Sequence, residues 1–239
     1  MITVEPIDRL EANRIVKNNH YSGTTCFGTS VSLGIYWKGM LVGVAQFGTG
    51  VNPKGTAKHV EGSTMKDYLE FNRMWLSDIA PHNSESQAIG QIFKWFKKNR
   101  PDIKWLISFA DGAMSKVGTI YQATNWIYTG YNKTGGLWVT KDGVRMHHAG
   151  LALKHKDTKR DTLEAHYGTP LYRVVGGQFR YIYFLDKRWK KRLAHKPLEY
   201  PKLDNIRDYI AIKKENWVHE DLWDEYQTVI NGASCASSS

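Results

Sequence analysis

Cysteine and long apolar runs are both scarce in this 239-residue chain. Its two cysteines, Cys26 and Cys235, argue against a disulfide framework, and no CxxC or paired cysteine–histidine spacing suggests a zinc site. No run approaches the roughly 18 consecutive apolar residues of a membrane-spanning helix. The first residues, MITVEPIDRLEANR, lack the apolar centre of a signal peptide. We therefore expect a soluble, intracellular protein that does not enter a membrane.

Aromatic residues, by contrast, are plentiful. The chain has nine Trp, thirteen Tyr and eight Phe, and 41% of its residues are hydrophobic. This composition is typical of a folded globule, and the length suffices for one good core with an appended subdomain. We expect a main domain at residues 1–186, a basic C-terminal extension at 187–231 packed on it, and a disordered tail at 232–239.

Positive charge is concentrated in one part of the chain. The net charge is +10, and residues 151–196 contain twelve Lys and Arg against four Asp and Glu, a local charge of +8. A dense basic surface favours nucleic acid over a membrane, because no amphipathic helix accompanies it. The alternative is a solvated lysine-rich rim, but the interleaved Trp189 favours nucleic acid. The candidate phosphate contacts are Lys154, Lys156, Lys159, Arg160, Lys187, Arg188, Lys190, Lys191 and Arg192.

The other patterns are organised around residues 69–101. Apolar residues alternate over 69–75, as in a strand, and Arg73 lies among them. A polar loop follows, and the helical spacing of the next apolar residues puts Ser84 and Ser86 at a helix N-terminus. Hydroxyls and free N–H groups beside an arginine are suited to the phosphates of a nucleotide-like cofactor. The alternative is an ordinary capped helix beside a structural arginine.

The remaining patterns predict a mixed sheet with helices on both faces. The expected elements are helices at 6–19, 84–100 and 117–126, hairpins at 31–47, 137–147 and 171–185, a central strand at 103–110, a helix or loop at 153–169, and one or two short helices within 205–230. Residues 69–110 should form one parallel strand–helix–strand unit. The predicted fold class is therefore α/β (α+β), with a central mixed sheet flanked by helices.

The order of these elements resembles the GNAT acyltransferase fold, in which the helix N-terminus after the fourth strand holds the coenzyme A pyrophosphate. A closer resemblance, over roughly residues 10–185, is to the Mom proteins of bacteriophages, which are divergent GNAT-like enzymes. These motifs occur in the family's order and at similar intervals. The segments that carry the resemblance are His20-Tyr21-Ser22, Asn72-Arg73-Met74, Asn83-Ser84-Glu85-Ser86 with Ile89-Gly90, and Asp111-Gly112 followed by Gly118-Thr119-Ile120-Tyr121-Gln122-Ala123.

The resemblance implies roles for individual residues. The positions linked to an acyl-coenzyme A-type donor such as acetyl-CoA are Arg73 and Ser86, with Ser84 and Gly90 in the same phosphate loop. Those linked to the active centre are His20, Tyr21, Asp111 and Tyr121. The family is described as holding iron there, and imidazole, carboxylate and phenolate are reasonable iron ligands, which makes His20, Asp111 and Tyr121 the candidates. Outside the resemblance, His20 reads as a helix end, Asp111 as a turn former and Tyr121 as core.

The implied reaction converts adenine in phage DNA to an N6-carbamoylmethyl form, which shields the DNA from host restriction. The N6 amine is a poor nucleophile because its lone pair is delocalised into the ring. The reaction therefore needs an activated electrophile or radical chemistry at a metal, and a base for the amine proton. Asp111 is the candidate base or ligand, with Tyr121 as proton relay or second ligand.

The target base in duplex DNA is stacked and paired, so the enzyme should flip it or act on opened DNA. The aromatic residues that could stack on an extruded base are Tyr21, Trp126, Tyr128 and Tyr131, although core packing is the better explanation for each one taken singly. The sequence does not define an oligomeric state, and a homodimer is one option. The resemblance places the protein in the cytoplasm of a bacterial host.

Two other functions are open at this point. A conventional GNAT N-acetyltransferase acting on an RNA, protein or small-molecule amine would use the same Arg73, Ser84 and Ser86 cradle and would need no iron. A non-enzymatic DNA-binding module would keep every function after Asp111→Ala. The grouping of Asp111, Tyr121 and His20 favours catalysis, because a pure binder has no use for a carboxylate beside its polyanion.

Overall fold

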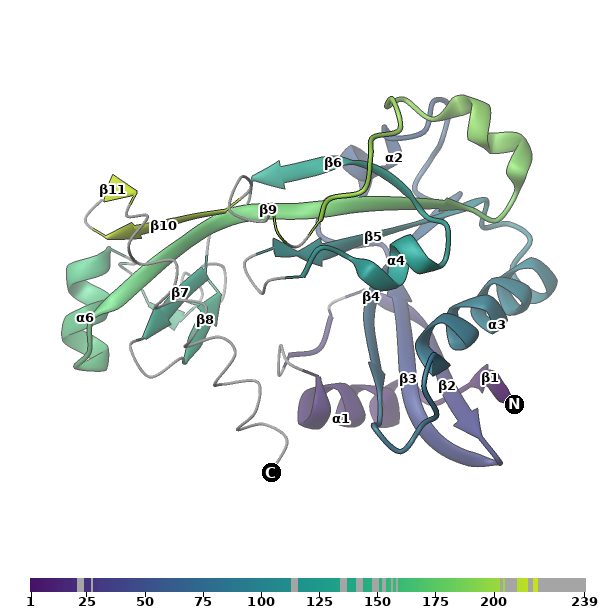
Figure 1. Ribbon diagram of the computed structural model, residues 1–239, viewed down its shortest axis with the longest axis horizontal. Coiled ribbons are helices and arrows are strands. Elements are labelled where there is room, and N and C mark those ends of the chain that lie inside the picture. The colour runs from purple at the N-terminus through teal and green to yellow at the C-terminus, as the bar shows by residue number, and fades with distance from the viewer. Residues whose placement is uncertain are drawn as a thin grey trace. The chain divides into compact units, whose positions relative to one another are not determined.

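The computed structural model describes residues 1–20, 24–26, 28–112, 116–133, 137–140, 144–147, 151, 154–155, 157, 159–202, 204, 210–214 and 217–218 (Figure 1). The chain divides into two compact units. Unit 1 comprises Met1–Phe109, Gly118–Gly130 and Arg180–Tyr200, and unit 2 comprises Ala110–Val117, Tyr131–Phe179 and Pro201–Ser239. No helix in the described part of the chain is long and apolar enough to cross a bilayer.

The strands are β1 (Ile2–Pro6), β2 (Thr29–Trp37), β3 (Met40–Gly48), β4 (Tyr68–Leu76), β5 (Trp105–Asp111), β6 (Ile127–Lys133), β7 (Leu137–Thr140), β8 (Arg145–His147), β9 (Leu171–Phe184), β10 (Ile210–Lys214) and β11 (Trp217–Val218). The helices are α1 (Arg9–Asn19), α2 (Pro53–Ala57), α3 (Ser84–Asn99), α4 (Thr119–Ala123), α6 (Arg160–Tyr167) and the 3-10 helix η2 (Lys187–Arg192). The predicted class, a mixed α/β sheet flanked by helices, is confirmed.

Unit 1 is built on β1 to β5. Strands β1 to β4 pair antiparallel in chain order, and β4 runs parallel to β5 through the crossover helix α3. The turn between β2 and β3 places Lys38 and Gly39 at φ 51° and 80°, the conformation that suits a two-residue hairpin. The predicted hairpin over 31–47 and the parallel unit over 69–110 are therefore confirmed.

Helix α1 begins later than predicted because a strand precedes it. Residues Ile2–Pro6 form β1, a short edge strand, and Pro6 ends it where a missing N–H is tolerated. The Asp8 carboxylate caps the helix by accepting from the N–H groups of Leu10 and Glu11. The helix predicted from residue 6 therefore starts at Arg9, and the sequence reading missed β1 altogether.

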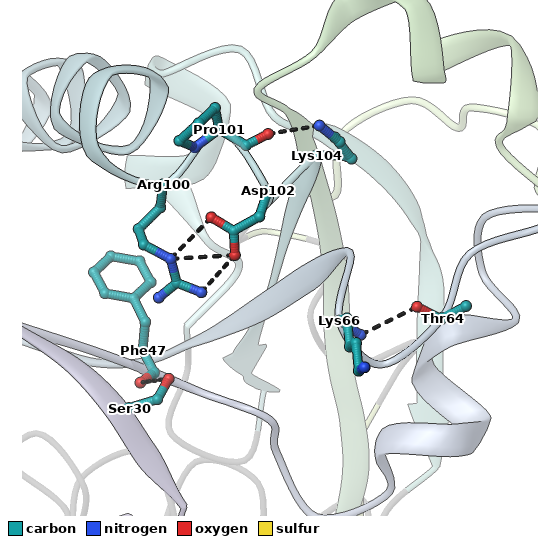
Figure 2. A network of polar contacts seen from close by, with 8 residues as sticks. All are labelled: Ser30, Phe47, Thr64, Lys66, Arg100, Pro101, Asp102 and Lys104. Carbon is teal, nitrogen blue, oxygen red and sulfur yellow. Dashed lines mark hydrogen bonds and ion pairs between the residues drawn. The ribbon is translucent and has the colours of Figure 1, made fainter.

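Helix α3 follows its predicted apolar spacing. Its buried apolar residues are Ala88, Ile89, Ile92, Phe93 and Phe96. The helix ends where the N–H of Arg100 donates to Phe96 O, and the Arg100 guanidinium then forms a close ion pair with Asp102 (Figure 2). This pair is well exposed, so it fixes the turn into β5 more than it adds stability.

The basic helix η2 belongs to unit 1 and is tied down at both ends. At its start, Asp186 donates its N–H to Lys104 O. At its end, the N–H of Glu61 donates to Arg192 O and the N–H of Ala194 donates to His59 O. The side chains of His59 and His195 meet there, with 2.6 Å between Nδ1 and Nε2. The backbone of η2 is therefore part of the folded body of unit 1.

Unit 2 contains β7 and β8, the first part of β9, β10, β11 and α6. The predicted hairpin over 137–147 is confirmed, since β7 and β8 pair antiparallel. Helix α6 lies within the segment predicted as helix or loop, and Gly168, at φ 65°, ends it. The small core of this unit consists of Trp138, Leu151, Leu163 and Leu171.

One prediction for the C-terminal half is wrong, and another falls mostly outside the described residues. Gly176 and Gly177 do not form a turn, because β9 continues through them as one strand from Leu171 to Phe184. A Cβ at Gly177 would lie 2.6 Å from the Tyr131 ring, so this glycine provides room for a neighbour and not for a turn. The described residues within 205–230 form the strands β10 and β11, and β10 pairs with β9. The one or two short helices expected in this range stay a prediction, because most of the range lies outside the described residues. The expected domain boundary at residue 186 stays a prediction.

Candidate functional site

Strands β4 and β5 separate soon after they meet. Their described pairing runs from Tyr68↔Trp105 to Glu70↔Ile107, and β4 then continues to Leu76 beside β3 (Figure 1). The strands thus form a wedge that opens beyond Glu70. Backbone groups on the two sides of such a wedge need other hydrogen-bonding partners, which a side chain or a ligand can supply.

Ser108 of β5 supplies one of those partners. Its hydroxyl is buried and lies 2.9 Å from Phe71 O and 2.7 Å from Tyr121 Oη. Because a carbonyl oxygen can only accept, the Ser108 proton goes to Phe71 O and the Tyr121 hydroxyl donates to Ser108. This bridge closes the narrow end of the wedge and fixes Tyr121 of α4 to both strands.

Tyr121, a predicted active-centre residue, is held as a neutral phenol. Its ring lies 5.2 Å from those of Trp126 and Tyr181, and burial raises the pKa of its hydroxyl. The hydrogen bond with Ser108 opposes that rise, and the charges of Glu70 and Arg73 also act on the phenol, with opposite signs. A neutral phenol suits a proton relay better than a metal ligand.

Arg73 faces the α1 side of the sheet. A bulge at Asn72 shifts the β3–β4 register so that Arg73 pairs with Gln46, and cross-strand partners face the same side. Gln46 donates to Asn13 of α1, which identifies that side. Arg73 donates from Nε to Thr24 O and from Nη1 to Asn72 O. The arginine therefore holds the segment that follows α1 against β4.

The predicted active-centre residues His20 and Tyr21 lie on this segment or next to it. The N–H of His20 donates to Val16 O and closes the last turn of α1. Tyr21 is outside the described residues. Thr24, which Arg73 contacts, follows His20 by four residues, so the arginine holds the chain at a point close in sequence to His20.

The N-terminus of α3 has the features of a ligand site. Its cap residue Asn83 has φ 63° and makes no side-chain cap, while Ser86 Oγ donates to Asn83 O. Ser84 is fully buried, and its Oγ has no hydrogen-bond partner among the described residues. A Cβ at Gly90 would meet no protein atom within 4 Å. A buried, unpartnered hydroxyl beside free helix N–H groups fits a polar ligand group such as phosphate.

The described contacts do not join Arg73 to this helix end. Helix α3 packs through Phe96 on Phe47, the neighbour of Gln46 in β3, and successive strand residues face opposite sides. Arg73 therefore lies on one face of the sheet and the body of α3 on the other. Sequence reasoning had grouped Arg73 with Ser84 and Ser86 because alternation alone could not reveal the bulge at Asn72.

The three proposed iron ligands do not all belong to the same unit. Asp111 ends β5 within unit 2, where its carbonyl accepts from the N–H of Lys116, whereas His20 and Tyr121 belong to unit 1. Among the residues that the structure describes, no group of three or more His, Cys, Asp or Glu side chains could hold a metal. Iron at His20, Asp111 and Tyr121 therefore stays a prediction.

Glu70 is the residue that the sequence reading missed. Its half-buried carboxylate lies on β4 between the wedge and Arg73, and burial raises its pKa against the opposing effects of Asn72 and Arg73. Nearby Cys26 also has a raised pKa, chiefly through burial, so its thiol stays protonated. The available signal was a glutamate at an alternating strand position three residues before Arg73, which by itself indicates nothing about chemistry.

The predicted phosphate contacts of η2 are all exposed, but they are not equivalent. Arg188 forms a two-bond ion pair with Asp186, which lowers the pKa of that carboxyl to about 2. The Arg192 guanidinium stacks 4.4 Å above the ring of Trp189, which packs on the core of unit 1 and is not a free stacking platform. The three lysines of η2, Lys187, Lys190 and Lys191, form no ion pair with a described residue and line one shallow depression with Arg188.

The predicted phosphate contacts at 154–160 belong to unit 2. Lys154 and Lys159 are exposed, and Lys154 Nζ lies 6.0 Å above the ring of Tyr167. Arg160 is paired with Glu164, which also accepts from the N–H of Leu171. Lys156 lies outside the described residues. The two exposed lysines are thus the cations of this segment best suited to a polyanion.

Two of the four aromatic residues expected to stack on a base are core residues. Trp126 is fully buried and Tyr128 is 3% exposed, so neither ring face is available to a ligand. Tyr131 is 38% exposed, so its ring remains a candidate for stacking on a base. Tyr21 is outside the described residues. Core packing explains Trp126 and Tyr128.

Comparison with known proteins identifies the family. The model of the Mom protein family matches residues 1–202. The chain belongs to the Mom protein family. The methylcarbamoylase mom of Escherichia phage Mu is 34% identical to it over 205 residues, which are 84% of each chain. This Mom-family chain is therefore similar to that relative along most of its length.

Solved structures with a similar layout include two N-acetyltransferases. The spermidine N-acetyltransferase of Vibrio cholerae, in complex with CoA and spermine, has a TM-score of 0.44 and 8% identity, covering 78% of this chain and 96% of its own. An N-acetyltransferase from Staphylococcus aureus Mu50 has a TM-score of 0.42 and 12% identity, covering 77% of this chain and 99% of its own.

Proposed function

We propose that this Mom-family protein is a transferase that converts adenine in DNA to N6-(carbamoylmethyl)adenine. The observation that carries the proposal is its 34% identity, over 84% of both chains, to a methylcarbamoylase of a bacteriophage. In this proposal the modified base protects phage DNA from host restriction, and the protein works in the cytoplasm of the bacterial host.

The donor in this proposal is an acyl-coenzyme A-type molecule held at the start of α3. Ser84, with its buried and unpartnered hydroxyl, and the free N–H groups of the first helical turn would hold its phosphates. Ser86 adds a second hydroxyl, and the open space at Gly90 admits the chain of the donor. Attack at the thioester carbon of such a donor would give an N6-acyl group, so the carbamoylmethyl product requires that the amine attacks a methylene carbon of the donor that carries the carbamoyl group and a leaving group.

The residues of this chain supply positioning and proton handling. Arg73 restrains the segment after His20 and Tyr21, so these two residues are the candidates for orienting the target base. Tyr121 can pass a proton because its hydroxyl donates to Ser108 and remains able to accept. Asp111, the last residue of the central strand β5, is a candidate active-centre carboxylate that binds the target base or takes up the proton after its first acceptor.

Double-stranded DNA is the partner that the charge distribution favours. The lysines of η2 are exposed on a backbone that is fixed at both ends, a suitable arrangement for contacts to phosphate. Because N6 of adenine is paired and stacked in a duplex, the target base would be flipped out before it reacts.

The test is mass spectrometry of nucleosides from plasmid DNA after expression of the protein in bacteria. We expect a heavier deoxyadenosine with the wild-type protein, and a greatly reduced amount with Asp111→Asn. The matched control is Asp161→Asn, an exposed aspartate on α6 of the same unit, which should modify DNA as the wild type does. The added mass distinguishes a carbamoylmethyl group from an acetyl group.

Unmodified deoxyadenosine in the presence of folded, abundant protein would contradict the proposal. An acetylated base would support the alternative of a conventional N-acetyltransferase, and modified RNA or protein amines would move that activity away from DNA. Equal modification by wild type and Asp111→Asn would remove Asp111 from the mechanism.

A further inference from the structure

Glu70 is a carboxylate whose position the fold alone does not require. It lies on β4 at the last residue pair before β4 and β5 separate, and its side chain is half-buried. Its one hydrogen bond among the described residues comes from Asn72 Nδ2, at 3.0 Å from Oε1. A carboxylate can accept about four hydrogen bonds, so most of the capacity of Glu70 is unused.

Two glycines make room for the Glu70 and Asn72 side chains. A Cβ at Gly50 would lie 2.1 Å from Glu70 Oε2, and a Cβ at Gly48 would lie 2.9 Å from Asn72 Oδ1. Half-burying a carboxylate without an ion pair costs stability. The arrangement therefore keeps one carboxylate partly shielded from water, at a cost in stability, while most of its hydrogen-bonding capacity is left for a ligand. A proton acceptor needs both properties.

Glu70 also lies on the same side of the sheet as Arg73, which in the proposed function restrains the segment after the residues that orient the target base. Gly48 pairs with Glu70, and Gln46 pairs with Arg73, which binds the segment after α1. The titratable or charged groups that act on Glu70 or feel its charge are Arg73 and Tyr68 of β4, Cys26 of the segment after α1, and Tyr121 of α4. The Cys26 thiol and both phenols have raised pKa values and stay neutral, so among these groups Glu70 is the base.

We propose that Glu70 accepts the proton of the adenine N6 amine during group transfer. The N6 lone pair forms the bond to the electrophilic carbon of the donor, and the bond between that carbon and its leaving group breaks. The electron pair of the broken bond departs with the leaving group, and the N6 proton passes to Glu70. Asn72 positions the carboxylate from one side, and its hydrogen bond and the charge of Arg73 both oppose the rise in the Glu70 pKa that burial causes. This inference rests on the proposed function.

The test compares Glu70→Gln with the wild type in the plasmid assay. Glutamine keeps the size of the side chain and the acceptor for Asn72 but cannot take a proton, so we expect modification to fall by about 10²–10⁴-fold. The matched control is Glu5→Gln, an exposed glutamate on β1 of the same unit, which should retain the wild-type rate. Thermal unfolding of both variants shows whether they fold alike.

A pH profile separates a proton acceptor from a structural group. With purified protein, plasmid DNA and the small-molecule fraction of a bacterial extract as the source of donor, the wild-type rate should rise with pH as Glu70 loses its proton. In Glu70→Gln that rise should vanish. In Glu70→Ala, which leaves a space of the size of a carboxylate, added formate should restore part of the activity.

Three outcomes would overturn the inference and leave the proposed function standing. They are wild-type modification by Glu70→Gln, an unchanged pH profile in that variant, or failure of formate to restore Glu70→Ala while that protein is folded. Absence of any modified deoxyadenosine with the wild type would instead contradict the proposed function itself.

Discussion

On the α3 side of β4, Phe71 is 4% exposed and stacks on Phe47 with 4.5 Å between the ring centroids. On the α1 side of the same strand lie the half-buried polar side chains of Glu70, Asn72 and Arg73. The first face is a close-packed core, in which each neighbour supports the next. The second carries a carboxylate with one hydrogen bond among the described residues, and the bulge at Asn72 brings Arg73 to the same face.

This contrast separates the residues that hold the strand in place from those available for chemistry. A side chain that stabilises the sheet has its contacts satisfied within the protein, whereas one that reacts with a ligand must keep part of its capacity unused. Strand β4 alternates between the two kinds, so one strand can serve both. Variants on the two faces should therefore affect different measurements.

The largest effect on stability is expected for Phe71→Ala. Removing a buried ring that contacts Phe47 should lower the free energy of unfolding by about 3–5 kcal/mol, because the cavity cannot collapse fully. Urea denaturation measures this. The matched variant on the other face, Glu70→Gln, should change stability by less than about 1 kcal/mol. Equal losses for the two variants would contradict the distinction between the faces.

Ser108→Ala should have the next largest effect, because Ser108 connects the two strands at the wedge. Its loss leaves the Phe71 carbonyl and the Tyr121 hydroxyl without a partner, which should cost about 1–3 kcal/mol of stability. Tyr121→Phe removes one of these two hydrogen bonds and should cost less, about 1 kcal/mol. Chemical denaturation of both variants checks the order. A larger loss of stability for Tyr121→Phe than for Ser108→Ala would contradict the role of Ser108 as the residue that connects the two strands.

The His59–His195 pair offers a polar contact away from β4 for comparison. Burial lowers the pKa of His59 from 6.5 to about 4, helped by the charge of Arg180. Between these values the unfolded chain binds more protons than the folded one, so this contribution is complete above about pH 6.5 and is lost toward pH 4. The loss should be on the order of 1 kcal/mol after solvent screening.

Urea titrations at several pH values, for wild type and His59→Asn, measure this contribution. The variant should lose the part of the pH dependence that lies between pH 4 and 6.5. If the two proteins have parallel stability profiles through that range, the histidine pair does not contribute as we expect.

The smallest effect on stability is expected at η2. Replacing Lys187, Lys190 and Lys191 by alanine should leave the unfolding free energy unchanged within about 0.5 kcal/mol, since all three are exposed. The same change should reduce the salt dependence of DNA binding, with the slope of log K against log salt falling by about 2.7. Fluorescence titrations over a range of salt concentrations measure it. An unchanged slope would show that DNA binds elsewhere.

The sequence was sufficient to predict an element of the fold where its local pattern agrees with the tertiary structure. The apolar spacing of α3 and the turn at Lys38 and Gly39 are strong local signals, and both elements are where we predicted them. Gly176 and Gly177 misled the reading because a glycine pair in which Gly177 makes room for Tyr131 looks the same in sequence as one that forms a turn. The strand β10 depends on pairing with β9, which no local pattern reveals.

The candidate site was less predictable for a similar reason. Family resemblance pointed to Arg73, Ser84 and Tyr121, but the side of the sheet on which Arg73 lies depends on the bulge at Asn72. The importance of Glu70 emerges only when burial, the neighbouring Gly50 and the separation of β4 from β5 are known together. Such information is tertiary and is absent from any short window of sequence.

The close approach of Gly50 to Glu70 has a consequence for the evolution of this family. Gly50 has φ 70°, and any side chain there would collide with the Glu70 carboxylate. A lineage that replaces the glycine must move the end of the glutamate side chain and also adopt a φ that L side chains rarely take, whereas one that loses the glutamate removes only the first of these costs. Position 50 should therefore stay glycine in most relatives, and most consistently in those that keep the glutamate.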